Sequence, residues 1–164
     1  MNLHEGPTYW DKTLVRDYQF EKLERDLKTK NLIIGGGMSG ALAAYALSSE
    51  GEDVTLIEKD KIGKGSSTAN TGLLQYCSDK MLSELAEEIG EEKAVLFYQM
   101  CLESMDHLTK LQKQLDKNTD YRLRESIYYA SDKKDVAKLK KEYGYLKKYD
   151  FPVEFLYRER LKAE

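Results

Sequence analysis

The chain has 164 residues, a net charge of −3 and a pI near 5.6, which suits one globular domain or slightly more. This acidic balance offers no basic surface for nucleic acid, and no apolar run approaches the roughly 20 residues that span a bilayer. The N-terminus lacks the pattern of a secretory signal, and the two cysteines lack metal-ligand spacing. We therefore expect a cytoplasmic protein with no transmembrane segment, metal site or nucleic-acid partner.

The first third of the chain predicts a polar arm followed by a βαβ unit. Residues 1–30 are expected to lie as an extended arm on the main body, with one helical turn. A buried strand is predicted from Asn31 to Gly35, because consecutive apolar residues are typical of a parallel strand covered on both faces. A helix rich in Ala and Leu is predicted from Ser39 to Glu50, and a second strand from Val54 to Glu58.

The remainder predicts helices interrupted by two strands. Two helices are expected at Asp79–Gly90 and Glu91–Asp116, and Asp132 is expected to cap a further helix. Alternating apolar residues predict a strand over Tyr121–Ala130, and Val153–Tyr157 predicts another. The apolar positions expected to face inward on the second helix are Phe97, Cys101, Leu108, Leu111 and Leu115, with Met105 alongside.

A glycine pattern, Gly35-x-Gly37-x-x-Gly40, links the first strand to the first helix. Gly35 permits a tight turn, Gly37 lets a pyrophosphate approach the backbone, and Gly40 lets the helix pack closely against the strand. The free N–H groups at the helix start, at Met38 and Ser39, and the helix dipole favour a phosphate there. The spacing therefore predicts a dinucleotide-binding turn.

Glu58 ends the second strand 23 residues after Gly35, near the roughly 20 residues of the dinucleotide pattern. A carboxylate at this place accepts hydrogen bonds from ribose hydroxyls and would repel the 2′-phosphate of NADP. The alternative is a surface glutamate beside an ordinary glycine turn. That alternative does not explain why the strand, the turn, the helix and the acidic residue all match the dinucleotide-binding pattern. The pattern alone does not separate NAD from FAD.

A loop rich in glycine and hydroxyl groups, "GKGSSTANTGLL", follows the second strand. Its hydrogen-bonding side chains are those of Ser66, Ser67, Thr68 and Asn70, while Gly65 and Gly72 allow close backbone approach. By itself such a stretch indicates an ordinary loop rather than a binding site.

Three stretches together resemble the D-amino-acid-oxidase-like (DAO) superfamily of FAD-dependent oxidoreductases: "LIIGGGMSGALAAYAL" at 32–47, "VTLIEKDKIGKGSS" at 54–67 and "TANTGLL" at 68–74. Within it, the gamma-glutamylputrescine oxidase and glycine oxidase type is the most similar, since its members also tend to carry a Tyr-Trp arm, matched here by Tyr9 and Trp10. The specific match covers about residues 8–76.

The resemblance implies an α/β fold, with a Rossmann-like FAD/NAD(P)-binding βαβ unit followed by helices and the start of an α+β substrate domain. Its boundaries would be an arm over 1–30, the FAD-binding unit with its flavin-side loop over 31–78, and the remainder over 79–164. The implied cofactor is FAD. The positions implied to bind it are Gly35, Gly37, Met38, Ser39, Gly40, Glu58, Lys59, Gly65, Ser66, Ser67, Asn70, Gly72 and Leu73.

The implied reaction is oxidation of the C–N bond of an amine or amino acid to an imine, with no residue assigned a catalytic role. His4 and His107 are the two histidines, and His107 is expected at the surface or in a structural role. Arg122 and Arg124 either bind a substrate carboxylate or belong to a solvated strand face, and the late tyrosines are expected to pack the substrate-domain sheet.

Family members are longer, so the chain resembles the N-terminal portion of such an enzyme. We expect that this portion alone cannot complete full turnover. We also expect that it either self-associates or needs a missing C-terminal half. A non-catalytic nucleotide-binding or interaction module that keeps only recognition of the ADP moiety is the alternative. An NAD-dependent dehydrogenase domain is a third possibility, against which the loop after the second strand argues.

Overall fold

The computed structural model describes residues 6, 8–13, 19–115, 118–157 and 160. It divides the chain into two compact units, unit 1 (Met1–Leu73) and unit 2 (Leu74–Glu164). His4 and the residues after 160 lie outside the described residues. None of the described helices combines the length and the apolar character that a membrane crossing requires.

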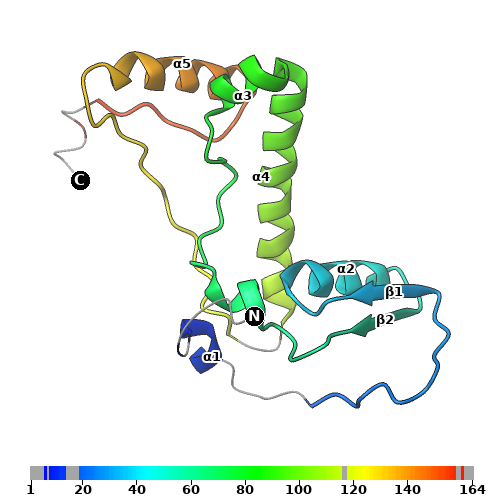
Figure 1. Ribbon diagram of the computed structural model, residues 1–164. Helices are drawn as coiled ribbons and strands as arrows, with labels where there is room; N and C mark the ends of the chain where they lie inside the picture. The colour runs from blue at the N-terminus through cyan, green and yellow to red at the C-terminus, as the bar shows by residue number, and fades with distance from the viewer. Residues whose placement is uncertain (1–5, 7, 14–18, 116–117, 158–159, 161–164) are drawn as a thin grey trace. The chain divides into compact units, whose positions relative to one another are not determined.

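Unit 1 contains a two-stranded parallel sheet and one helix that joins the strands. Strand β1 (Asn31–Ile34) pairs in register with β2 (Val54–Ile57) over the full length of both. Helix α2 (Met38–Ser49) connects them and packs against both strands (Figure 1). The predicted βαβ unit is confirmed, with element bounds that differ from the prediction by one residue.

The sheet of unit 1 is covered on one face only. Ile33 points toward α2, where its Cγ2 would lie 3.4 Å from a Cβ added at Gly40. Leu32 and Ile34 project to the opposite face and are 54% and 79% exposed. The expectation of a strand buried on both faces was therefore wrong, because α2 is the only helix on this sheet in the described part of unit 1.

The arm carries a single short helix. Helix α1 (Tyr9–Thr13) contacts the 3-10 helix η1 (Gly65–Ala69), which lies in the loop after β2. Residues 19–30 then run to β1 without helix or strand. An extended arm with one helical turn was predicted, and the structure adds the surface on which α1 packs.

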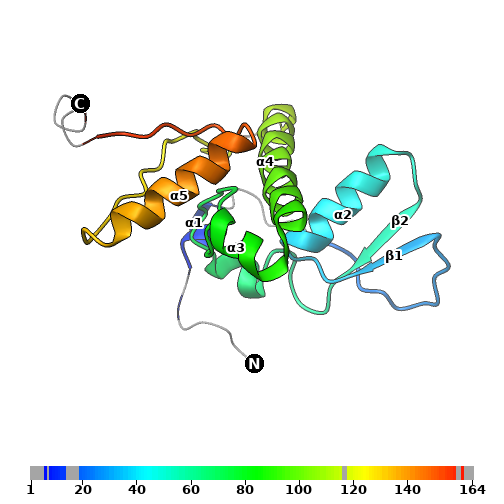
Figure 2. The same ribbon diagram turned by 90° about the horizontal axis from the view of Figure 1, so that it is seen from above.

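Unit 2 is helical in its described part. It consists of α3 (Leu82–Ile89), α4 (Glu91–Gln114) and α5 (Asp135–Lys148). Figures 1 and 2 show the short α3 beside the beginning of α4 and the end of α5. Gly90 turns the chain between α3 and α4 with φ +91°, a conformation that favours glycine. The three helices were predicted, and the predicted ends differ from the observed ones by at most three residues.

The core of unit 2 forms where these helices meet. Tyr98 is 1% exposed, its ring lies edge-on to Phe151, and its hydroxyl donates to the Lys80 carbonyl at 2.6 Å. The buried cluster consists of Leu82, Ala86, Ala94, Val95, Tyr98, Leu146 and Phe151. Burial in the cluster raises the pKa of Tyr98 to about 12, since the charged phenolate would lose its hydration.

The inward face of α4 differs from the predicted one. Ala94, Val95 and Tyr98 are its buried residues, whereas Phe97 is 44% exposed and Cys101 is only partly buried. Apolar residues follow more than one side of this helix, so periodicity cannot select the side that receives neighbours. The actual side is the one that α3 and Phe151 cover.

A buried carboxylate joins α5 to α3. Glu142 is 5% exposed, and its two oxygens accept the backbone N–H groups of Leu82 and Ser83 at 2.8 Å each. The first N–H groups of a helix have no acceptor within that helix. Here a side chain from α5 supplies the acceptors. This contact fixes the approach of α5 to the start of α3.

The two strands predicted for unit 2 are absent from its described residues. Residues 121–130 and 153–157 have no ladder partner, and Tyr128 and Tyr129 are each 69% exposed. An alternating sequence forms a strand only where another strand satisfies its backbone groups. The two strand predictions, and the packing of the tyrosines on their sheet, were therefore wrong, whereas the assignment of residues 79–164 to the start of a substrate domain stays a prediction.

Candidate functional site

The glycine turn has the two mechanical properties predicted for its first and third glycines. Gly35 has φ +105°, and its N–H continues the sheet ladder to the Ile57 carbonyl at 2.8 Å. A Cβ at Gly40 would lie 1.9 Å from the Gly35 carbonyl oxygen, so only glycine allows α2 to approach the strand this closely. The turn and the close packing are confirmed.

Gly36, which the sequence did not single out, is held by hydrogen bonds through both its N–H and its carbonyl. Its N–H donates to Glu58 Oε2 at 2.7 Å, and its carbonyl accepts the Gly63 N–H at 2.8 Å. A Cβ here would lie 2.3 Å from Ile62 Cδ1. The middle glycine of the run was the available signal, because the dinucleotide spacing needs a glycine at 35 and 37 but not at 36.

Glu58 is tied to the glycine turn. Oε2 accepts from Gly36, and Oε1 accepts the Asp60 N–H at 3.0 Å. These backbone donors, Gly36 first, lower the pKa of Glu58 below its ordinary value of 4.5. A carboxylate has about four acceptor positions, so two remain for ribose hydroxyls. The ribose contact itself stays a prediction.

Ser67 reaches from the loop after β2 to the start of α2. Its Oγ accepts the Met38 N–H at 3.0 Å, and a Cβ at Gly37 would lie 3.1 Å from the same oxygen. The serine hydroxyl thereby takes one of the helix's unpaired N–H groups and keeps its own hydrogen for an acceptor such as a phosphate oxygen. Gly37 and Ser67 face each other across the mouth of the turn.

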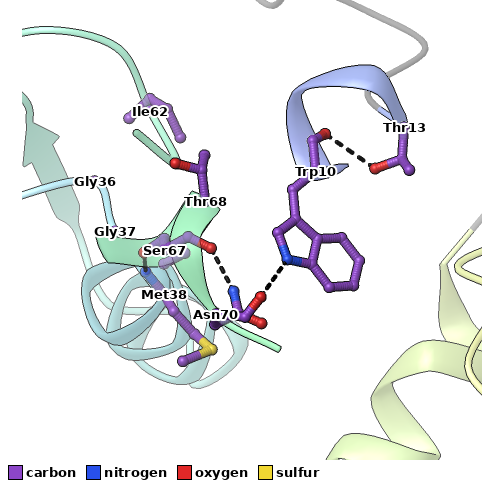
Figure 3. Close-up of a pocket in the computed structure, with 11 residues that line it drawn as sticks. Trp10, Thr13, Gly36, Gly37, Met38, Ile62, Ser67, Thr68 and Asn70 are labelled. Atoms are coloured by element: carbon purple, nitrogen blue, oxygen red, sulfur yellow. Dashed lines mark hydrogen bonds between the residues drawn. The ribbon is translucent and has the colours of Figure 1, made fainter. Parts of the chain in front are cut away.

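Asn70 organises the loop. Its Oδ1 accepts the Gly72 N–H at 2.8 Å, its Nδ2 donates to the Ser67 carbonyl, and its carbonyl accepts Trp10 Nε1–H at 2.8 Å (Figure 3). Both ends of its side-chain amide are thus engaged within the loop. Asn70 was predicted to contact the cofactor, and the structure gives it a role in shaping the loop that borders the cleft.

These residues surround a cleft of about 350 Å³ that lies wholly within unit 1. Its lining, seen in Figure 3, consists of Trp10, Thr13, Gly36, Gly37, Met38, Ala41, Ile62, Gly63, Ser67, Thr68 and Asn70. Of the predicted positions, the cleft brings together Gly37, Met38, Ser67 and Asn70. The predicted positions outside the lining are Gly35, Ser39, Gly40, Glu58, Lys59, Gly65, Ser66, Gly72 and Leu73.

The sequence missed most of the apolar lining. Ile62 and Gly63 come from "KIGKG", where only the later Gly65 was noted, and Trp10 was recorded only as part of the arm. The available signal for Trp10 was its being the single tryptophan of the chain.

The cleft fits one end of a dinucleotide. A phosphate would be accepted where three features meet: the backbone at Gly37, which carries no side chain, the start of α2 and the Ser67 hydroxyl. The volume of the cleft lies in the range of small-molecule pockets. Among the described residues no group of His, Cys, Asp and Glu is arranged to hold a metal ion.

The other candidate residues belong to unit 2. His107 lies on α4 with an exposed side chain. Arg122 and Arg124 are exposed, and Arg122 pairs with Asp120 at 3.7 Å. The structure gives none of the three a place in the cleft of unit 1.

Comparison with known proteins gives one family. The model of the DAO family, described as FAD dependent oxidoreductase, matches residues 30–164. No solved structure matches the chain.

Several curated proteins are similar to the chain over part of their length. YhfW of Bacillus subtilis, described as a Rieske 2Fe-2S iron-sulfur protein, is 26% identical over 85% of this chain. Gamma-glutamylputrescine oxidoreductase of Escherichia coli is 25% identical over 75%, and aerobic glycerol-3-phosphate dehydrogenase of Staphylococcus saprophyticus is 31% identical over 58%. The matches cover 27%, 29% and 17% of these relatives, so the chain spans less than a third of each.

Proposed function

The chain belongs to the DAO family of FAD-dependent oxidoreductases, and from that premise we propose that unit 1 binds FAD through the cleft beside the glycine turn. The observation that carries the proposal is the convergence of Gly37, the start of α2 and Ser67 on one side of this cleft. That arrangement accepts a phosphate without any rearrangement of the backbone.

The residues of unit 1 would hold the dinucleotide in separate ways. The Ser67 hydroxyl donates to a phosphate oxygen while it accepts from Met38, and Gly37 keeps the approach free of side-chain atoms. Glu58 uses its two remaining acceptor positions for ribose hydroxyls. Bound FAD would supply a two-electron acceptor for oxidation of a substrate.

We propose that the reaction is oxidation of the C–N bond of an amine or amino acid to an imine. The substrate carbon gives up a hydride and the nitrogen gives up a proton, so that two electrons leave the C–N unit. Two observations support this substrate class: the similarity to gamma-glutamylputrescine oxidoreductase, and the motifs shared with amine-oxidising members of the family. The described residues carry no assigned catalytic group.

Two other functions have support. The similarity to glycerol-3-phosphate dehydrogenase favours oxidation of a C–O bond as the second candidate. A non-catalytic module that keeps only recognition of the ADP moiety is the third, since a βαβ unit suffices for that recognition. The three differ in whether bound flavin is reduced, and by which substrate class.

The test is a titration of the 164-residue chain with FAD, followed by flavin absorbance and fluorescence. We expect saturable binding, with a Kd at least about tenfold higher for Gly37→Ala. The backbone at Gly37, φ −78°, suits alanine, so this variant should fold normally. A change in its Kd should then reflect only the methyl group that fills the space beside the turn. Tight NAD binding without FAD binding would contradict the proposed cofactor.

The flavin-loaded chain then separates the three functions. Anaerobic bleaching of the flavin by an amine or amino acid supports C–N oxidation, and bleaching by glycerol 3-phosphate supports the second candidate. Binding without bleaching by either class supports a module limited to recognition.

The partners and location inferred from the sequence remain proposals. We propose a cytoplasmic protein whose partners are a small amine or amino acid and a second copy of the chain. The exposed apolar positions Leu32 and Ile34 on the free face of the sheet support association. Sedimentation velocity over a range of concentrations tests it, and a monomer at every concentration would contradict self-association.

A further inference from the structure

Trp10 reaches the cleft from a part of the chain far from the glycine turn. Its indole Nε1–H donates to the Asn70 carbonyl at 2.8 Å, across 60 residues of sequence. Its ring also lies against Gly72, where a Cβ would stand 2.6 Å from Trp10 Cζ2 and 2.8 Å from Cη2. A side chain at position 72 is thus excluded by the indole ring as well as by φ +74°.

The loop that receives Trp10 is the loop that borders the start of α2. Asn70 holds Ser67 through its Nδ2, and Ser67 Oγ holds the Met38 N–H at 3.0 Å. Trp10, Asn70, Ser67 and Met38 therefore form a continuous chain of hydrogen-bonded residues from the arm to the glycine turn (Figure 3). The position of the indole and the position of the phosphate-facing hydroxyl are linked.

The indole is suited to this place by its chemistry. Its polar N–H is satisfied by the Asn70 carbonyl, which leaves a large apolar ring among the lining residues of the cleft. Tyr9, the adjacent aromatic residue, stands edge-on to Trp10 at 5.1 Å between ring centres, yet it is 67% exposed and does not line the cleft. Of these two adjacent aromatic residues, only Trp10 therefore faces the ligand space.

We propose that Trp10 is a cofactor-binding residue: its indole forms one wall of the FAD cleft, touches the bound dinucleotide and holds the loop of residues 65–72 in its binding conformation. This inference rests on the proposed FAD function of unit 1. It assigns the N-terminal arm, a segment outside the βαβ unit, to the cofactor site.

The experiment compares Trp10→Ala, Trp10→Phe and Gly72→Ala with the unaltered chain in FAD titrations monitored by flavin fluorescence. We expect the Kd to rise at least about tenfold for Trp10→Ala. It should rise less for Trp10→Phe, which keeps an aromatic wall but loses the N–H donor. Gly72→Ala should weaken binding by displacing an intact indole.

Tyr9→Ala is the matched control, since it removes an exposed aromatic ring from the same short helix. Its Kd should remain within about twofold of the unaltered chain. Circular dichroism of every variant checks that α2 to α5 still form, and Trp10→Phe provides a mild change should Trp10→Ala fail to fold.

Contact is measured separately by ¹⁹F NMR of the chain labelled with 5-fluorotryptophan, which carries a single resonance because Trp10 is the only tryptophan. FAD should shift that resonance. An unmoved resonance together with an unchanged Kd for Trp10→Ala would overturn the assignment of Trp10 while leaving FAD binding intact. Absence of any flavin signal with the unaltered chain would overturn the proposed function and this inference with it.

Discussion

Gly37 and Gly40 belong to one motif, yet a methyl group would have opposite consequences at the two positions. At Gly37 it would meet only the movable Ser67 hydroxyl at 3.1 Å, whereas at Gly40 it would meet the backbone oxygen of Gly35 at 1.9 Å. A side chain can rotate away, but a strand held in a sheet cannot move without breaking its ladder. The fold therefore requires glycine at 40 but not at 37, and this difference agrees with the proposed role of Gly37 in leaving room for the cofactor.

We predict that Gly40→Ala destabilises unit 1 by about 1–3 kcal/mol or more, because α2 must move away from β1. Thermal and urea unfolding measure the loss. Gly37→Ala is the matched control and should unfold like the unaltered chain while it binds FAD poorly. Equal stability of the two variants would contradict the close contact between Gly40 and Gly35.

Glu58 predicts a pH dependence of the stability of unit 1. The backbone N–H groups of Gly36 and Asp60 lower its pKa in the folded state below 4.5, so the unfolded chain takes up its proton first as the pH falls. The contribution of Glu58 to the free energy of unfolding is fully present above pH 4.5. It is lost as the pH falls from 4.5 through the pKa of Glu58 in the folded state. Urea unfolding at a series of pH values measures the loss.

Glu58→Gln should remove part of this acid dependence and lower stability at neutral pH, since its amide NH2 would face either the Gly36 or the Asp60 N–H. Glu24→Gln, at an exposed position of the arm, is the control and should retain the dependence of the unaltered chain. Identical acid profiles for the two variants would argue against the Glu58 contacts.

At the scale of elements, the link between α3 and α5 depends on one buried side chain. Glu142 supplies acceptors to two N–H groups at the start of α3, and unpaired buried donors are costly. We predict that Glu142→Gln lowers the free energy of unfolding of unit 2 by about 1–3 kcal/mol, since its NH2 would face a backbone donor. Chemical denaturation followed by far-UV circular dichroism measures the change.

Glu87→Gln tests the same pair of helices from the outside. Glu87 pairs with Lys141 where both side chains are largely exposed, so water screens the interaction. This variant should unfold almost like the unaltered chain. If Glu87→Gln lowered the free energy of unfolding as much as Glu142→Gln does, burial would not be the reason why the Glu142 contact stabilises unit 2.

At the scale of the whole molecule, the proposed FAD site and the helical core belong to different units. Every residue that lines the cleft lies in unit 1, and every residue of the buried cluster around Tyr98 lies in unit 2. We predict that saturating FAD slows amide hydrogen exchange over residues 36–41 and 65–72, because a ligand stabilises the segments that it contacts.

Exchange over α5 is the internal control and should be unchanged by FAD. Hydrogen-exchange mass spectrometry of the full chain, with and without FAD, measures both regions in one experiment. Protection centred on α5 instead would place the cofactor outside the cleft described for unit 1.

The sequence by itself determined the βαβ unit of unit 1, the glycine turn within it and the helices of unit 2. Gly35, Gly40 and Glu58 were recognisable because the strand, turn, helix and second strand are consecutive, so their spacing alone encodes the geometry. The helices of unit 2 were recognisable for the same reason, since an α-helix satisfies its backbone within one segment.

Tertiary structure decided what depends on neighbours distant in the chain. The side of α4 that is buried, the lack of a strand at 121–130 and 153–157, and the partnership of Trp10 with Asn70 each depend on which segments meet. A strand needs a partner and an apolar face needs a cover, and neither requirement is written in the residues of the segment itself.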